Sequence, residues 1–167
     1  MLNHKAMEFT LKQLSPDNIK LLLEQAFIDI DSVIPVEFEK DGITQKHCGH
    51  VWVKDDGALW RITPTSAEFI QFSYTFTLPA NEVDAPEMVL LKASNLFDAF
   101  PVHMKYQGKD KNGDEMFSMI YSQIFPSEGT CSAKQFVKIF RTFQKLTRQN
   151  MSHFNEVINI AKNGTIN

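Results

Sequence analysis

The amino-acid sequence predicts an α+β protein in which an antiparallel sheet of five or six strands carries three helices, mainly on one face. Apolar residues recur at helical spacing near the start, in the middle and at the end of the chain. The segments between them alternate polar with apolar residues and are joined by Asp-Gly and Asn-Gly pairs, which favour tight hairpins. The predicted order is one helix, three or four strands, a second helix, two strands and a long C-terminal helix.

The first helix has a clear start signal. Ser15 is a good N-cap, and Pro16 suits the first helical position. The apolar face is predicted to continue to Ile30 and consists of Ile19, Leu22, Leu23, Ala26, Phe27 and Ile30. A strand is expected next, over residues 34–38, ending at Asp41-Gly42.

A hairpin is predicted around Asp56-Gly57, because glycine accepts the positive φ that a two-residue turn requires. This turn places Val53 opposite Trp60 on one face of the hairpin. It places Trp52 opposite Arg61 on the other face. The following segment, residues 70–78, alternates large apolar with polar residues and predicts a strand whose register is firmly set.

The second half of the chain is predicted to hold two helices and one hairpin. Pro86 opens the second helix, which continues to about Phe100. A hairpin that turns at Asn112-Gly113 pairs Met104 with Tyr121. Ser132 and Gln135 have the spacing of a capping box and open the final helix, which is expected to end near Ala161.

Composition and length indicate one domain over residues 1–167, with residues 1–14 loosely ordered and a core over 15–161. The chain is 43% hydrophobic and 22% charged, which excludes a disordered or low-complexity protein. The first residues do not resemble a secretory signal, and no run is long enough to cross a bilayer as a helix. The two cysteines, Cys48 and Cys131, form no disulfide framework. We therefore expect a cytoplasmic protein.

Charge is distributed unevenly along the chain. Residues 131–167 hold six basic residues and one acidic residue, a balance of +5, whereas the preceding residues hold 11 basic and 19 acidic, a balance of −8. Five of the basic residues recur every three or four positions on one side of the predicted final helix, opposite its apolar side. This basic stripe consists of Lys134, Lys138, Arg141, Lys145 and Arg148. It is either a solvated helix face or a surface for an acidic partner or nucleic acid.

No catalytic motif, phosphate-binding glycine loop or dinucleotide fingerprint is present, so we expect neither enzyme activity nor a cofactor. His47, Cys48 and His50 are possible metal ligands, but on a strand the two histidines would point to opposite faces, so no metal site is expected. Residues 110–115 lack the spacing of a calcium loop. Cys131, just before the final helix, is either an inert cysteine or a thiolate favoured by the helix dipole.

Trp52 and Arg61 remain as a candidate binding surface. If they share one hairpin face, they can stack as a cation–π pair. A Trp on an uncovered sheet face favours a partner or dimer surface. The alternative is that the second helix covers it within the same chain.

The order of elements resembles that of type III secretion chaperones and of the YbjN-type bacterial proteins. The residues that carry the resemblance are Ser15-Pro16-Asp17-Asn18 before the first helix, the aromatic strand before the second helix, and Cys131 to Phe136 entering the last. It covers residues 15–161. The stretch from Ile34 to Leu78 holds one strand more than that pattern expects, and the final helix is longer. The resemblance implies no enzyme activity, frequent homodimers, and roles in protein binding or regulation.

The leading hypothesis is a non-enzymatic bacterial protein that binds another polypeptide and forms a homodimer through the second helix, with Trp52 and Arg61 as contact residues. The first alternative is a nucleic-acid-associated regulator that uses the basic stripe. The second alternative is an enzyme whose site assembles around His50 and Asp55.

Overall fold

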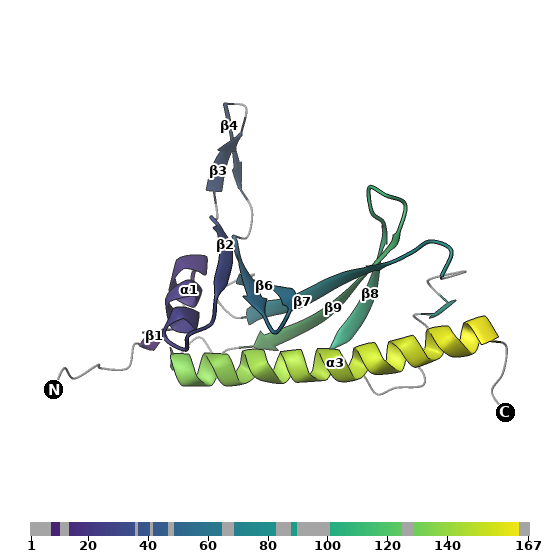
Figure 1. The fold of residues 1–167 in the computed structure, drawn as a ribbon. Helices are drawn as coiled ribbons and strands as arrows, with labels where there is room; N and C mark the ends of the chain where they lie inside the picture. The colour runs from purple at the N-terminus through teal and green to yellow at the C-terminus, as the bar shows by residue number, and fades with distance from the viewer. Residues whose placement is uncertain are drawn as a thin grey trace. The chain divides into compact units, whose positions relative to one another are not determined.

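The computed structural model describes residues 8–10, 14–35, 37–40, 42–46, 49–64, 69–82, 88–89, 101–124 and 129–163. These ranges contain ten strands and two helices, most of which are labelled in Figure 1. The helices are α1 (Pro16–Glu24) and α3 (Ala133–Asn163). A six-stranded antiparallel sheet has the order β2-β5-β6-β7-β9-β8. In that order its strands are Ile30–Ile34, His50–Asp55, Ala58–Pro64, Phe69–Leu78, Glu115–Ile124 and His103–Lys109.

Two further sheets have two strands each. β1 (Glu8–Thr10) pairs with β10 (Thr130–Ser132), and β3 (Glu37–Lys40) pairs with β4 (Ile43–Lys46), both antiparallel. The expected strand over residues 34–38 is therefore divided, because β2 ends at Ile34 and β3 begins after Pro35. Proline has no N–H for a sheet ladder, which explains the interruption.

The predicted fold class, with three helices in the order α-β(3-4)-α-β2-α, is wrong. The described residues form two helices and ten strands, which is a more strand-rich arrangement. The helix expected over residues 86–100 lies outside the described residues except for Met88 and Val89. The additional strands have three or four residues each, and segments that short show no measurable periodicity in the sequence.

Helix α1 begins as predicted but ends earlier. The Ser15 side chain accepts a hydrogen bond from the Asn18 N–H at 3.2 Å, and Pro16 is the first helical residue. The helix ends at Glu24, so Phe27 lies beyond it and Ile30 begins β2. The apolar residues keep their helical spacing beyond Glu24, but the chain leaves the helix there. Sheet pairing of Ile30, which is opposite Val53, outweighs the local helical propensity.

The described chain divides into two compact units. The first comprises residues 1–72 and 122–141, and the second comprises residues 73–121 and 142–167. Strands β7 and β9 and helix α3 each contribute residues to both units, and Figure 1 draws α3 as one continuous helix. The prediction of one domain stays a prediction.

The core of the first unit lies on one face of the β5–β6 hairpin. Its register is the predicted one, with Val53 opposite Trp60 and Trp52 opposite Arg61. The Trp60 ring meets Phe140 of α3 edge-on at a centroid distance of 6.3 Å. The fully buried residues on this face of the hairpin are Val51, Val53, Trp60 and Ile62. Helix α1 contributes buried Ile19, Leu22 and Leu23 to the same unit.

The core of the second unit is built around Phe117. Phe76 stacks on it at 5.6 Å, and Phe154 of α3 meets it edge-on at 5.0 Å. Val89, Val157 and Ile158 complete this cluster.

The predicted register of the β8–β9 hairpin is wrong by two residues. Met104 pairs with Met119 in place of Tyr121. The reason is a longer turn, in which Lys109 pairs with Glu115, together with a bulge between Tyr106 and Gly108. From His103 to Tyr106 the shift of two residues leaves each side chain on its predicted face, whereas beyond the bulge the shift is one residue.

The start of α3 is as predicted. The Ser132 N–H donates to Gln135 Oε1 at 2.9 Å, and the Gln135 N–H donates to Ser132 Oγ at 3.3 Å. These two bonds form the capping box expected from the sequence.

Candidate functional site

The Trp52 side of the β5–β6 hairpin is the first candidate surface. Asp56 and Gly57 both have positive φ, 51° and 73°, as a type I′ turn requires, and this turn fixes the register. The Arg61 guanidinium carbon lies 5.8 Å from the Trp52 ring centroid, and the His50 ring meets Trp52 edge-on at 5.6 Å. All three side chains are partly exposed. At such a site a cation–π pair contributes about 0.5–1 kcal/mol.

Neighbouring side chains extend this surface, and the exposed Asp31, which accepts a hydrogen bond from Ser32 Oγ at 3.3 Å, adjoins it. β2 pairs Ser32 with Trp52 and Ile34 with His50, and paired residues share a face. We call the whole set the Trp52 face. It consists of Ser32, Ile34, His50, Trp52, Lys54, Leu59, Arg61 and Thr63. Lys54 and Arg61 make it basic, and Leu59 is 43% exposed. The arrangement fits a partner with carboxylates beside apolar side chains.

Asp55 lies on the opposite side of the hairpin from His50. Its side chain forms an ion pair with Arg141 of α3, and its carbonyl accepts a hydrogen bond from Trp60 Nε1 at 3.0 Å. Strand alternation turns residues 50 and 55 to different faces. The structure therefore does not bring together the two residues around which an enzyme site was considered.

The basic stripe lies on α3, and all five of its side chains are exposed. Lys134, Lys138 and Arg141 belong to the first unit, whereas Lys145 and Arg148 belong to the second. Arg141 is bound to Asp55, so part of the positive charge is neutralised on the protein itself. Binding by these residues stays a prediction.

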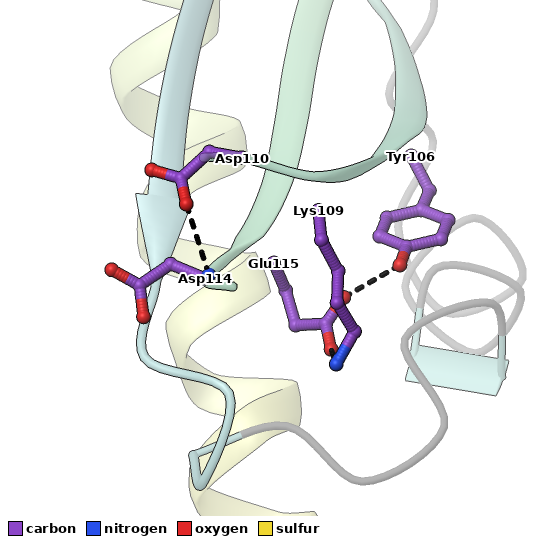
Figure 2. A network of polar contacts seen from close by, with 5 residues as sticks. All are labelled: Tyr106, Lys109, Asp110, Asp114 and Glu115. Carbon is purple, nitrogen blue, oxygen red and sulfur yellow. Dashed lines mark hydrogen bonds and ion pairs between the residues drawn. The ribbon is translucent and has the colours of Figure 1, made fainter. Parts of the chain in front are cut away.

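Sequence reasoning missed a polar network at the β8–β9 hairpin. Figure 2 shows Tyr106 and Lys109 directed toward Glu115. Tyr106 Oη donates to Glu115 Oε2 at 2.5 Å, and Lys109 Nζ lies 3.1 Å from Glu115 Oε1. Glu115 is only 4% exposed, and the Tyr106 hydrogen bond, followed by Lys109, lowers its pKa. A signal existed in the sequence, because Lys109 and Glu115 flank the predicted turn.

The Asp110 carboxylate is occupied by hydrogen bonds within the turn itself. Asp110 Oδ1 accepts hydrogen bonds from the N–H of Asn112 at 2.7 Å and of Asp114 at 3.0 Å. This pattern is an Asx turn, which explains Asp110 structurally. Within the described ranges no cluster of three or more histidine, cysteine or acidic residues forms a potential metal site. His47 and Cys48 lie outside those ranges.

Cys131 is 2% exposed, and burial raises the pKa of its thiol to about 11. A thiol with this pKa is protonated at neutral pH, which favours an inert cysteine over a reactive thiolate.

In the part of the chain that the structure describes, neither helix has the length and apolar character needed to cross a bilayer.

Comparisons with known proteins give one structural match. No family model matches the chain, and no curated protein matches its sequence. The crystal structure of YbjN from E. coli, described as a candidate transcription regulator, aligns with a TM-score of 0.54 and 11% sequence identity. The alignment covers 89% of this chain and 92% of YbjN. The resemblance to YbjN-type proteins is therefore confirmed at the level of the fold, and the chain has a YbjN-like fold.

Proposed function

We propose that this chain is a non-enzymatic regulatory protein that binds another polypeptide through the Trp52 face. The observation that carries the proposal is Trp52 itself, which remains partly exposed while Arg61 and His50 pack against it. Tryptophan and arginine are the side chains that most often dominate the energetics of protein interfaces. The YbjN-like fold supports a regulatory role, because YbjN is itself described as a candidate transcription regulator.

We further propose that the protein is cytoplasmic, acts in a chaperone-like way and associates with itself. Support comes from the resemblance to chaperones and YbjN-type proteins. The segment expected to mediate dimerisation, residues 86–100, lies outside the described residues apart from Met88 and Val89. Sedimentation velocity over a range of protein concentrations measures self-association directly, and a monomer at every concentration contradicts this part of the proposal alone.

The test of the Trp52 face compares Trp52→Ala with Thr63→Ala, a matched change on the same face of the hairpin. Proteins that co-purify with each variant from the native cell are quantified, and the recovered partner is then titrated in purified form. We expect Trp52→Ala to weaken binding at least about tenfold, since a buried aromatic anchor contributes about 2 kcal/mol or more. Equal affinity of the Trp52→Ala variant and the unchanged protein would contradict the proposal.

A second candidate function is nucleic-acid binding, favoured by the five exposed cations of the basic stripe. Fluorescence anisotropy with duplex DNA and with single-stranded RNA at about 50 mM salt tests it, because phosphate contacts are strong at low salt. Binding that disappears in a Lys138→Glu, Arg141→Glu, Lys145→Glu variant supports it. Unchanged anisotropy of both nucleic acids excludes it.

A further inference from the structure

Helix α1 ends in a backbone motif that normally uses glycine. The Ile28 N–H donates to the Leu23 carbonyl at 3.2 Å, and the Phe27 N–H donates to the Glu24 carbonyl at 3.0 Å. These two bonds define a Schellman motif with Phe27 at its left-handed position, where φ is 57°. A residue with a Cβ adopts this conformation at a cost that glycine does not bear.

Burial of the Phe27 side chain in the core does not offset this cost. It is 96% exposed, more than any other large apolar side chain among the described residues. Exposure of an aromatic ring and a left-handed backbone are both unfavourable for an isolated protein, and both occur at this single residue. Such outliers persist where they contribute to function.

Acidic residues line a groove that Phe27 also borders. Phe27 borders a groove of about 470 Å³ that is also lined by Glu24, Asp29 and Asp31. Lys20, 3.7 Å from Glu24, is the one cation among the lining residues. The excess of negative charge repels nucleic acid and anionic lipid, and attracts basic side chains.

The neighbouring strand is poorly suited to pairing with an added strand. β2 lies at an edge of the six-stranded sheet in the described residues, but its register shifts between Ile30 and Ser32, and Pro35 follows it. A bulge, a charged residue and a proline are the features that block edge-to-edge association. The recognition element is therefore the protruding ring with its acidic surroundings.

We infer that Phe27 is an anchor residue that inserts into an apolar pocket of a partner protein, and that Lys and Arg side chains at the rim of this pocket meet Glu24, Asp29 and Asp31. The inference shares with the proposed function only the premise that the chain binds a polypeptide. Ser32 borders both the groove and the Trp52 face, but the proposed anchor is a different side chain, so loss of binding in Trp52→Ala and loss of binding in a Phe27 variant are separate results.

The first experiment asks whether Phe27 has a structural role. Urea unfolding is compared for the unchanged protein, Phe27→Gly and Met88→Ala, the last removing another exposed apolar side chain. We expect Phe27→Gly to unfold at the same or a higher urea concentration, because glycine suits the left-handed position. A lower midpoint than that of the unchanged protein would show that Phe27 stabilises the fold and would overturn the inference.

The second experiment identifies the partner. Phe27 is replaced by the photoreactive p-benzoylphenylalanine, and crosslinks formed in the native cell are analysed by mass spectrometry. We expect one adduct, attached near Lys or Arg residues of a different protein, with its yield at least tenfold lower in an Asp29→Lys, Asp31→Lys background. Glu156→Lys, an equally exposed charge change on α3, serves as the control and should leave the yield unchanged.

The purified partner is then titrated against the unchanged protein and Phe27→Gly. A loss of affinity of tenfold or more, in a variant that is no less stable, supports an anchor role. Equal affinity of the unchanged protein and Phe27→Gly overturns the inference. So does the absence of an adduct, or an adduct with a second copy of this chain. A crosslinking yield that is unchanged by the charge reversal at positions 29 and 31 also overturns it.

Discussion

At the residue scale, Phe27 illustrates how one position can oppose stability. The left-handed conformation costs a non-glycine residue about 1–2 kcal/mol, and glycine recovers part of this while losing some chain entropy. A net gain of about 1 kcal/mol in the free energy of unfolding is therefore expected for Phe27→Gly. The Trp52 face differs, because Trp52 packs against Arg61 and His50 in an ordinary extended backbone.

Cys131 provides a prediction of chemical reactivity. In a Cys48→Ser background it is the single remaining thiol. Since its pKa is raised to about 11, the folded protein at about pH 8 holds on the order of a hundredfold less thiolate than an ordinary cysteine. We expect slow reaction with the disulfide reagent DTNB when the protein is folded and rapid reaction in urea, measured by absorbance. Rapid labelling of the folded protein would contradict an inert Cys131.

At the element scale, the β8–β9 hairpin predicts a pH dependence. The Tyr106 hydrogen bond and Lys109 lower the pKa of Glu115 below its ordinary value of about 4.5. A carboxyl group with a lowered folded-state pKa contributes stability that is complete above the unfolded value and is lost as the pH falls through the folded value. We expect the urea midpoint of the unchanged protein to fall below about pH 4.5 more steeply than that of Glu115→Gln.

Asp114→Asn provides the control for this measurement, because it neutralises an acid of the same turn that has no bond to Tyr106. It should retain the steep decrease of the unchanged protein. If Glu115→Gln shows the same decrease as Asp114→Asn, the Tyr106–Glu115 contact has no net effect on stability.

The capping box of α3 yields a second prediction at this scale. Ser132→Ala removes the side chain that accepts the Gln135 N–H, and should lower the free energy of unfolding by about 1 kcal/mol. Ser152→Ala is the matched control, since Ser152 is exposed in the middle of the same helix, where alanine is favoured. Urea unfolding measures both, and equal stability of the two variants would contradict a stabilising cap.

At the scale of the whole molecule, β7, β9 and α3 each contribute residues to both units, which favours cooperative unfolding of the two units. An element that unfolds in one unit exposes groups that it contributes to the other, so we expect a single transition. Both tryptophans lie in the first unit, and Tyr106 and Tyr121 lie in the second. Tryptophan and tyrosine fluorescence should therefore report the same urea midpoint. Two separate midpoints would show that the units unfold independently.

Much of the secondary structure followed from local patterns. The β5–β6 register was predictable because Asp56-Gly57 permits one tight turn, and the start of α3 was predictable because Ser132 and Gln135 have capping-box spacing. The end of α1 and the β8–β9 register were not predictable. The first depends on pairing of Ile30 with β5, and the second on a bulge near Gly108, neither of which leaves a periodic signal.

The sequence by itself determined which side chains are apolar, which turns are tight, and that five cations of α3 share one side of the helix. Only the tertiary structure showed that Asp55 holds Arg141, that Tyr106 and Lys109 converge on buried Glu115, and that Phe27 points to solvent from a left-handed residue. The physical reason is that these relations depend on strand pairing and on contacts between distant segments, whereas periodicity reports only the local geometry of one element.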